Sequence, residues 1–412
     1  MSRVLAAVAC ALALFGVASC GGGGGGSGRA TINLWVFNEP SGTFNDAVKR
    51  CTASSGGKYQ IVYNKLSTDA DAQRQSLVRR LAAKDSSIDI MGMDVVWTAE
   101  FAEANWLRAW PASLAAQLRQ GTLAGPMQTA TFNGKVWAAP ANSNTQLLWY
   151  RKDLVRNPPS TWNALIDAAS RIKQAPYLEI QGAQYEGSTV WFNALVQSAG
   201  GSIVKGTTVT LGPQGQLAAQ IISKLAHSPA ADPSLASSKE DQNRLAFEAG
   251  KAAFQVNWPF IYPSAKADNP KLFKNIGWAP YPSVVAGRPA KAPIGGINWG
   301  VSAYSKHPTE AFAAAACLRN RQNQMEAAIK GGLPPTLSAL YSDPALIKEY
   351  PFAALIRKQL ATAGVRPQTP AYADVSLAVA KAVSPANSID TKGFVNRLRS
   401  TLQDALNSKA LL

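Results

Sequence analysis

A regular alternation of strand and helix patterns is the feature that most constrains the fold of this chain. The pattern predicts strands over residues 31–37, 59–64 and 88–93, with helices over 42–51 and 69–83 between them. The first strand alternates polar and apolar side chains, and the second helix carries apolar residues at helical spacing. A βαβαβ run of this kind predicts a mostly parallel sheet covered by helices, and therefore an α/β fold.

Polar residues directly after the predicted strands are the first candidates for a binding site. Asn38 and Glu39 follow the first strand, and Asp94 follows the third. Ligands of open α/β sheets bind beyond the carboxyl ends of the strands, where these side chains are expected to lie. Each residue is equally compatible with a helix N-cap or a turn, so its position alone leaves both roles open.

Two later segments are expected to cross between domains. Residues 136–144 carry Pro140, Asn142 and Asn144 into an apolar strand over 145–150, and the glycine-rich segment 294–301 forms a second crossing. The further predicted elements are a helix over 244–250, a strand over 252–257 that ends in a turn at Trp258 and Pro259, a helix over 309–318, and a helical tail.

The length of the chain allows two separate cores. It has 412 residues, of which 47% are hydrophobic. We expect an N-terminal α/β domain of residues 30–141 and 298–332, and a C-terminal α/β domain of residues 142–297 and 333–412.

The first 20 residues have the layout of an export signal. One positive charge at Arg3 precedes an apolar run over residues 4–17, and small residues stand before Cys20. The run is too short for a membrane span, which needs about 20 residues. The tetrapeptide Val-Ala-Ser-Cys resembles the bacterial lipobox, although an ordinary cleaved signal with a coincidental cysteine is the alternative. We expect a signal peptide over 1–19, lipidation at Cys20 and a glycine-rich flexible tether over 20–29 that anchors the protein to the outer face of the cytoplasmic membrane.

The charge of the chain does not predict a nucleic-acid partner. The formal net charge is +16, from 41 basic and 25 acidic residues. The basic residues are scattered, with Arg79 and Arg80 beside Arg74 as the densest cluster, and such clusters on helices are usually solvated. A location next to an anionic cell envelope is enough to explain the positive charge of the chain.

Two cysteines remain after removal of the signal and acylation of Cys20. Cys51 and Cys317 stand at the ends of predicted helices in the same domain, so a disulfide between them is favoured over two buried thiols. Zinc is disfavoured because four-ligand spacing is absent and the only histidines, His227 and His307, are far from both cysteines. No metal and no cofactor is expected.

Several strings carry a resemblance to a known family. The matching strings are 138–162, 247–259 and 294–296. They resemble the hinge region of the sugar-binding proteins of ABC importers, the maltose-binding-like group. Within that group the chain most resembles the trehalose-binding lipoproteins of mycobacterial importers, over essentially its whole length after Cys20. The segments of this closer match are 94–101 (DVVWTAEF), 144–150 (NTQLLWY), 256–260 (VNWPF), 331–334 (GGLP) and 365–367 (VRP).

The resemblance implies a two-domain periplasmic-binding-protein type II fold that closes about a hinge on a saccharide in the interdomain cleft. The family's ligand contacts carry over most directly onto Asp94, Asn144, Trp258 and Arg366. They carry over less directly onto Glu240, Asn38 and Glu39, whose surroundings differ from the mycobacterial pattern, and the chain is shorter than that relative between residues 260 and 278. The implied cargo is a disaccharide, trehalose foremost, and the implied partners of this monomer are a membrane permease and its cytoplasmic ATPase.

The residue types at these positions suit a neutral sugar. Sugar hydroxyls both donate and accept hydrogen bonds, and a sugar ring presents an apolar face, so a site needs carboxylates, amides and an aromatic plate. Trp258, between a strand and a proline, is the best placed stacking residue. Arg366 is expected to bind vicinal hydroxyls or to clamp Asp94 or Glu39. Other tryptophans are expected to be core or domain-surface anchors, namely Trp35, Trp106, Trp162 and Trp191.

Other functions remain open from the sequence. The ligand could be another α-linked saccharide such as a maltodextrin. An exported glycoside hydrolase would need two carboxylates about 5–9.5 Å apart, for which Glu39 and Asp94 are the candidates, but no nucleophile motif, metal cluster or phosphate loop supports an enzyme. A structural envelope lipoprotein without a ligand is the third alternative. We therefore expect a binding protein with no catalytic residue.

Overall fold

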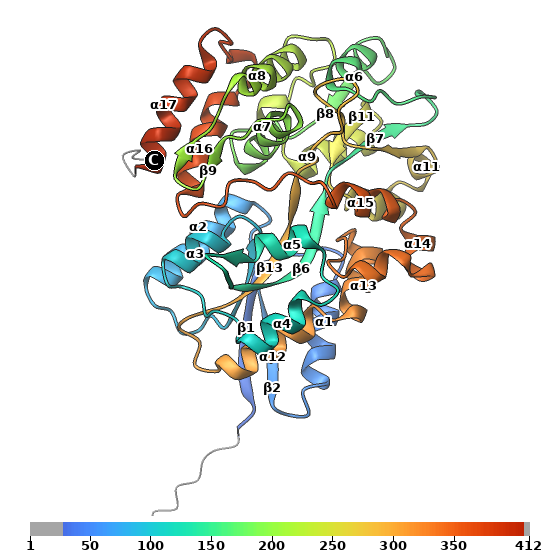
Figure 1. Ribbon diagram of the computed structural model, residues 1–412. Helices are drawn as coiled ribbons and strands as arrows, with labels where there is room; N and C mark the ends of the chain where they lie inside the picture. The colour runs from blue at the N-terminus through green and yellow to red at the C-terminus, as the bar shows by residue number, and fades with distance from the viewer. Residues whose placement is uncertain (1–27, 408–412) are drawn as a thin grey trace, which may run out of the picture.

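The computed structural model describes residues 28–407. The predicted signal peptide, the lipidation site Cys20 and most of the tether lie outside these residues. The described chain forms two α/β domains, each with its own sheet, one at the base of Figure 1 and one above it. None of the helices between residues 28 and 407 is long and apolar enough to cross a membrane.

The first domain contains a five-stranded sheet in the order β2-β1-β3-β13-β6. Its strands are β1 (Ala30–Phe37), β2 (Tyr59–Leu66), β3 (Ile90–Asp94), β6 (Ala138–Thr145) and β13 (Ile294–Val301). The predicted βαβαβ start is confirmed, since β2 and β3 both pair with β1 in parallel. The whole sheet is mixed rather than mostly parallel, because β13 runs antiparallel to both β3 and β6. The reason is that β6 leads out of the domain and β13 leads back into it.

Helices cover both faces of this sheet. The helices of this domain are α1 (Thr43–Ala53), α2 (Ala70–Ala82), α3 (Thr98–Glu103), α4 (Ala112–Arg119), α5 (Ala124–Thr129), α12 (Pro308–Leu318) and α13 (Arg321–Gly331), with a hairpin of β4 (Thr131–Phe132) and β5 (Lys135–Val136). Ile32, Leu34 and Val36 pack with α1 and α12. Met91 and Met93 lie on the other face and pack with α2 and α3. Burial of such a side chain stabilises the fold by about 1.5–3 kcal/mol, so both layers contribute to the stability of this domain.

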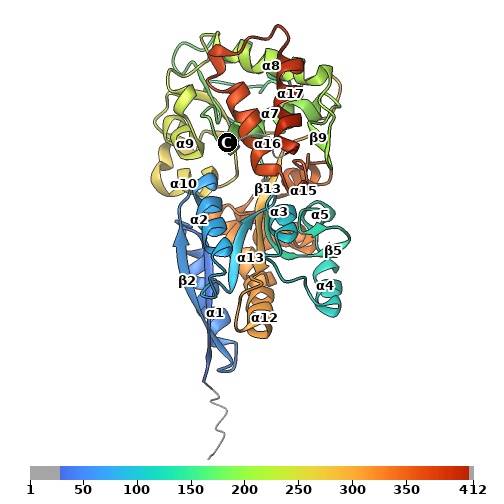
Figure 2. The same ribbon diagram turned by 90° about the vertical axis from the view of Figure 1, so that its left-hand side faces the viewer.

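The second domain is built on a four-stranded sheet in the order β12-β7-β11-β8. Its strands are β7 (Leu147–Arg151), β8 (Tyr177–Glu179), β11 (Ala252–Asn257) and β12 (Ile276–Ala279), with a hairpin of β9 (Val204–Lys205) and β10 (Thr208–Val209). Its α-helices are α6 (Trp162–Ala169), α7 (Glu186–Ser198), α8 (Pro213–Ala226), α9 (Glu240–Glu248), α10 (Ile261–Asp268), α11 (Pro270–Phe273), α14 (Pro344–Glu349), α15 (Ala353–Leu360), α16 (Tyr372–Val383) and α17 (Phe394–Leu406). Three short 3-10 helices cover Leu235–Ser237, Ser338–Ser342 and Ala386–Ser388. Figure 2 shows α7, α8, α16 and α17 together in this domain, away from α1 and α12 of the first.

The tryptophans follow the predicted division between core and surface. Trp162 and Trp191 are buried and pack together in the core of the second domain. Trp35 and Trp106 are half-buried at the margin of a first-domain core. These four side chains therefore serve packing within the domains.

Three segments cross between the domains: the two predicted crossing strands and a third segment after α13, which the predicted domain limit at 332/333 also requires. The strand β6 continues into β7 through Gln146, and β13 returns. The additional segment follows α13, where Ser143 N donates to Pro334 O at 2.9 Å beside the crossing strand β6. These crossings support our proposed domain limits of 30–141 with 298–332 and 142–297 with 333–412.

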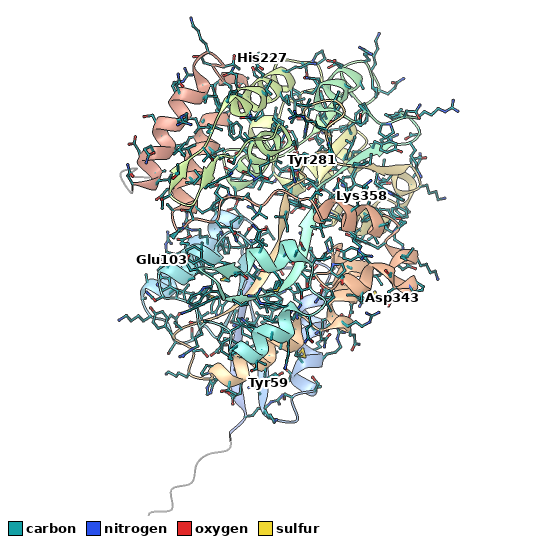
Figure 3. All side chains as sticks on the ribbon, in the orientation of Figure 1. Tyr59, Glu103, His227, Tyr281, Asp343 and Lys358 are labelled. Atoms are coloured by element: carbon teal, nitrogen blue, oxygen red, sulfur yellow. A yellow bond between two sulfur atoms is a disulfide. The ribbon has the colours of Figure 1, made fainter. Side chains whose placement is uncertain are left out.

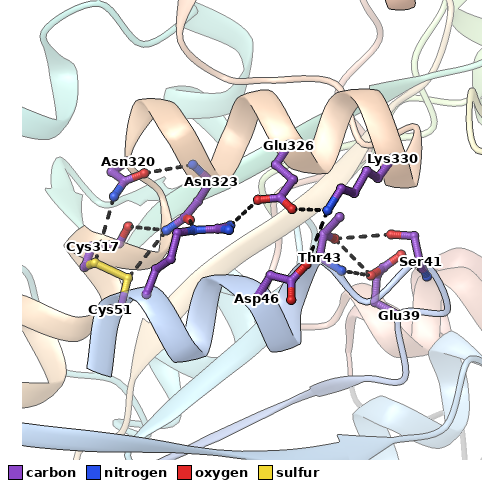
Figure 4. Close-up of polar contacts among 11 residues, drawn as sticks. Glu39, Ser41, Thr43, Asp46, Cys51, Cys317, Asn320, Asn323, Glu326 and Lys330 are labelled. Carbon is purple, nitrogen blue, oxygen red and sulfur yellow. Dashed lines mark hydrogen bonds and ion pairs between the residues drawn. A yellow bond between two sulfur atoms is a disulfide. The ribbon is translucent and has the colours of Figure 1, made fainter. Parts of the chain in front are cut away.

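A disulfide joins α1 to α12 in the first domain. Cys51 and Cys317 are bonded, with their Cα atoms 5.8 Å apart (Figure 4). Helix α13 packs beside this bridge, where Asn323 Nδ2 donates to Cys317 O at 2.9 Å and Arg50 Nε donates to Asn323 Oδ1 at 2.9 Å. Arg50 also pairs with Glu326. These contacts hold α13 along α1, so the end of α13 is fixed against the start of α1.

Helix α9 begins earlier than predicted. It starts at Glu240 rather than at residue 244. The backbone N–H of Lys239 donates to Gln242 Oε1 at 3.2 Å, which satisfies a donor at the start of the helix. The extra turn places Glu240 at the first position of the helix, next to the end of β11.

Candidate ligand-binding site

Asp94 lies between the two domains at the end of β3. Its Oδ1 accepts a hydrogen bond from Val96 N at 3.2 Å and one from Arg366 Nη2 at 2.9 Å. Arg366 belongs to the segment between α15 and α16 of the second domain. The side chain of Arg366 is 1% exposed, whereas that of Asp94 is 21% exposed. Asp94 therefore keeps part of its carboxylate open to a ligand while one oxygen is held by the arginine.

The guanidinium of Arg366 is held by a second carboxylate, Glu186, at the start of α7. Nη1 of Arg366 pairs with Glu186 Oε1, which also accepts from Tyr372 Oη at 2.5 Å. Ser376 Oγ donates to the other oxygen of Glu186 at 2.5 Å. Glu186 of the second domain, itself held by Tyr372 and Ser376, thus fixes the arginine that reaches Asp94 of the first.

Neighbouring negative charges raise the pKa of Arg366 more than burial lowers it. Burial lowers the pKa of Arg366, but the negative charges of Asp94 and Glu186 and the hydroxyl of Tyr372 raise it above its ordinary value. Burial also raises the pKa of the Glu186 carboxyl, and Arg366 opposes that rise. The pair is therefore favourable only while both members are present.

The structure separates the two roles predicted for Arg366. The arginine clamps Asp94, not Glu39, and both of its terminal nitrogens are engaged by carboxylates. Glu186 was missed by sequence reasoning. The available signal was that it is the only charged residue in the otherwise buried helix α7.

Trp258 and Asn144 lie side by side at the crossing strands. A Cβ atom on Gly295 would lie 3.0 Å from the Trp258 ring and 3.6 Å from Asn144 Cβ, so the ring packs directly on the backbone of β13. A side chain at this position would require the Trp258 ring to shift by a few tenths of an ångström. Asn144 Oδ1 is buried and has no hydrogen-bond partner among the described residues. An aromatic plate therefore stands next to an unsatisfied amide oxygen.

Glu240 stands close to Trp258 and to Tyr185. Burial raises the pKa of Glu240, while Tyr185 and Trp258 next to it oppose the rise. Tyr185 is buried, and its hydroxyl has no hydrogen-bond partner within residues 28–407. Burial, followed by the charge of Glu240, raises the pKa of Tyr185 well above its ordinary value. Tyr185 therefore remains a neutral donor and acceptor.

Lys239 closes this side of the site. Its Nζ lies 4.8 Å above the centre of the Tyr185 ring. The same amine pairs with Asp69, the N-cap of α2 in the first domain. This ion pair, like that between Arg366 and Asp94, joins the two domains.

Glu39 is engaged in the first domain itself. Its carboxylate accepts from Ser41 N at 2.8 Å, from Thr43 N at 2.9 Å and from Thr43 Oγ1 at 2.9 Å (Figure 4). It therefore caps the start of α1, the alternative that the sequence left open. Asn38 is exposed, and its backbone N–H donates to Leu66 O at 3.1 Å. Glu39 also lies beside the last residue of α13, since a Cβ on Gly331 would lie 3.2 Å from Glu39 Oε1.

A series of contacts connects the other predicted residues. Asp94 pairs with Arg366, and Arg366 pairs with Glu186. The neighbouring Tyr185 lies beside Glu240, which lies beside Trp258. Trp258 in turn covers the backbone beside Asn144. Within the described residues no group of three or more histidine, cysteine or carboxylate side chains could hold a metal ion.

Two α/β domains joined by crossing strands around a polar, tryptophan-containing site define the class of two-domain solute-binding proteins. This chain belongs to the family of bacterial extracellular solute-binding proteins, whose model matches residues 35–325. The family consists of binding proteins rather than enzymes, and its extracellular description agrees with the predicted export.

Relatives and solved structures agree with this family. A probable ABC transporter-binding protein of Deinococcus radiodurans is 31% identical over 321 residues, which cover 73% of this chain and 74% of the relative. Maltose-bound MalE3 of T. maritima has a TM-score of 0.83 at 24% identity, covering 91% of this chain and 99% of that chain. The GacH receptor of Streptomyces glaucescens, solved unliganded and with acarbose, has a TM-score of 0.79 at 22% identity, covering 92% and 98%. The two-domain fold with a hinge and an interdomain cleft, predicted from the sequence, is thereby confirmed.

Proposed function

We propose that the protein is the substrate-binding lipoprotein of an ABC sugar importer and that it binds a disaccharide, trehalose foremost, between its domains. The observation that carries this proposal is the fixed ring of Trp258 beside Asn144 and Glu240. An apolar plate flanked by polar oxygens is the arrangement that a sugar ring with its hydroxyls requires. The proposed ligand-binding residues are Asn38, Glu39, Asp94, Asn144, Glu240, Trp258 and Arg366.

Unsatisfied polar atoms support a ligand rich in hydroxyl groups. In the part of the chain that the structure describes, neither Asn144 Oδ1 nor Tyr185 Oη has a hydrogen-bond partner, and both are buried. Buried polar groups normally have partners. A sugar hydroxyl can donate to the amide oxygen, and the tyrosine can donate to or accept from another hydroxyl.

Asp94 and Arg366 have different proposed roles. Arg366 orients Asp94 by holding its Oδ1, and the carboxylate then accepts hydrogen bonds from sugar hydroxyls. A charge-assisted hydrogen bond of this kind is about twice as strong as a neutral one. Asp94 is therefore the proposed ligand contact, and Arg366 positions it.

The choice of a disaccharide rests on the resemblance of the sequence to trehalose-binding lipoproteins. Structural neighbours are described with bound maltose, maltotriose, D-mannitol and ribitol, so the fold itself accepts different polyols and sugars. Another α-linked saccharide such as a maltodextrin is the second candidate. A glycoside hydrolase is disfavoured because the Glu39 carboxylate, one of its two required groups, is engaged by the start of α1.

The proposed location follows from the N-terminal sequence. A signal peptide over 1–19 would be removed, and acylated Cys20 would hold the protein at the outer face of the cytoplasmic membrane. The bound sugar would then be passed to a membrane permease whose ATPase is cytoplasmic. The protein is proposed to act as a monomer.

Calorimetry with trehalose, maltose, maltotriose and D-mannitol tests this function. We expect trehalose to bind most tightly and to be recovered without release of glucose. Trp258→Ala should weaken binding by about 30-fold, since removal of a central tryptophan commonly costs 2 kcal/mol or more. Trp258→Phe is the matched control and should lose less, because it keeps an aromatic face. If none of these ligands binds, or if Trp258→Ala binds as the wild type does, the proposed site is wrong.

A further inference from the structure

Four exposed basic side chains gather at one end of the first domain. Because β1, β2 and β3 are parallel, the segments before them meet at the same edge of the sheet. Arg29 precedes β1, Lys58 precedes β2, and Lys84 lies in the turn before β3. Lys306 follows β13, whose last residues pair with the start of β3. We call these four residues the basic end.

The basic end lies far from the proposed sugar site. Asn38 and Glu39 follow the carboxyl end of β1, whereas Arg29 precedes its amino end. The eight residues of β1 span about 26 Å at 3.3 Å per residue. Figure 3 labels Tyr59, the first residue of β2, at this end and His227 at the opposite end of the molecule. A partner bound here would leave the region between the domains accessible.

The positive charge of the basic end is not neutralised by the protein. Within residues 28–407, none of the four cations pairs with a carboxylate, and all four are exposed. Two neighbouring carboxylates are already engaged. Asp85 pairs with Arg80, and Asp89 is buried and accepts from Asn33 N and Ser305 Oγ. The four cations therefore face solvent without forming an ion pair in the described part of the chain.

We propose that the basic end binds an anionic lipid surface and so orients the protein on the membrane. The inference rests on the lipid anchor included in the proposed function. Ten residues from Cys20 to Arg29 separate the lipid from β1 and span at most about 36 Å when fully extended. The chain that leads to the lipid therefore joins the first domain at the end that carries the unpaired cations. Electrostatic attraction to an anionic membrane acts within a Debye length of about 8–10 Å, which this length of chain permits.

In this orientation the proposed sugar site lies away from the lipid surface. With the basic end on the membrane, the carboxyl end of β1 stands about one strand length above the lipid surface and the second domain lies above it. Each basic residue near an anionic surface strengthens binding by about fivefold. Four such residues supply an appreciable affinity even without the lipid chains.

The test uses the mature chain with Cys20→Ser, which removes acylation and isolates the contribution of the protein surface. Co-sedimentation is measured with vesicles of phosphatidylcholine alone and with vesicles that contain 30% phosphatidylglycerol. We expect binding to the anionic vesicles only, and loss of that binding in 0.5 M NaCl. The triple substitution Lys58→Gln, Lys84→Gln and Lys306→Gln should lower the partition coefficient at least tenfold.

A matched triple variant in the second domain controls for the net charge of +16. Lys205→Gln, Lys358→Gln and Lys381→Gln also remove three exposed lysines, and this variant should bind as the parent does. Equal losses in both triple variants, or no binding of the parent to anionic vesicles, would overturn the proposal. Calorimetry with trehalose on the same three proteins separates this outcome from a failure of the proposed sugar site.

Discussion

Replacing Arg366 by methionine should cost the protein a large part of its stability. The substitution keeps an unbranched apolar side chain but removes the guanidinium that pairs with Asp94 and Glu186. Two carboxylates of neighbouring segments then face one another without a cation. The loss arises mainly from the carboxylates left behind rather than from the arginine itself.

The size of the loss follows from the burial of these partners. Breaking a buried ion pair by removing one partner costs about 3–5 kcal/mol. Asp94 is 21% exposed and can regain some hydration, and Glu186 keeps the hydroxyls of Tyr372 and Ser376. We therefore expect the free energy of unfolding to fall by about 3 kcal/mol, the lower limit of this range. At about 2–4 °C per kcal/mol for a domain of this size, the melting temperature should fall by about 6–12 °C.

Differential scanning calorimetry of the wild type and of two variants measures this loss. Arg321→Met is the control, because Arg321 is 55% exposed and pairs with Asp343 at the surface. Its removal should cost less than about 1 kcal/mol. Calorimetric titration of Arg366→Met with trehalose should also show weaker binding, since Asp94 loses the group that orients it. If Arg366→Met melts within 3 °C of Arg321→Met, the central role assigned to this ion-pair cluster is wrong.

Two further predictions concern the disulfide and a buried glutamate. Replacing Cys51 and Cys317 by serine removes a cross-link between residues 266 positions apart and should lower the free energy of unfolding by about 2–5 kcal/mol. A reductant should reproduce this loss in the wild type and leave the double variant unchanged. Burial, aided by the charge of Asp232, raises the pKa of Glu179 from 4.5 to about 8. Between these values the folded protein holds a proton that the unfolded chain releases, so stability should fall as pH rises from 4.5 to 8, by at most about 5 kcal/mol. Glu179→Gln should remove this decline, and an unchanged decline in denaturation experiments across that range would contradict the assignment.

The sequence predicts elements best where short apolar runs end at clear breaks. Both bounds of β11 are as predicted, since glycine and proline residues flank this run, and the predicted crossing segment 294–301 coincides with β13. The third crossing after α13 was implied only by the predicted domain limit at 332/333 and not by any pattern, because residues 333–335 form no strand of their own and pair only with β6. The direction of β13 was also missed, since a strand pattern carries no information about its partners.

Candidate site residues could be named from the sequence, but their contacts could not. Asp94 and Arg366 were both named from the sequence, yet they are 272 residues apart and only the fold brings them together. Glu186, 180 residues from Arg366, carries no motif. Lys239 and Asp69 are also typical surface residues in the sequence, and their ion pair depends on the placement of the two domains. Long-range pairs of charges are therefore the part of this site that sequence patterns leave out.

Three carboxylates that are alike in the sequence differ in what they can offer a ligand. Glu39 accepts three hydrogen bonds from the start of α1, so a sugar would have to compete with the helix for its oxygens. Asp94 gives one oxygen to Arg366 and stays partly exposed. Glu240 pairs with no basic side chain in the part of the chain that the structure describes, and it stands next to the Trp258 ring. A carboxylate can accept hydrogen bonds from sugar hydroxyls only with the lone pairs that the protein does not already use. Glu240 and Asp94 should therefore contribute more to sugar affinity than Glu39. Glu39 then acts by holding the loop before α1 in place.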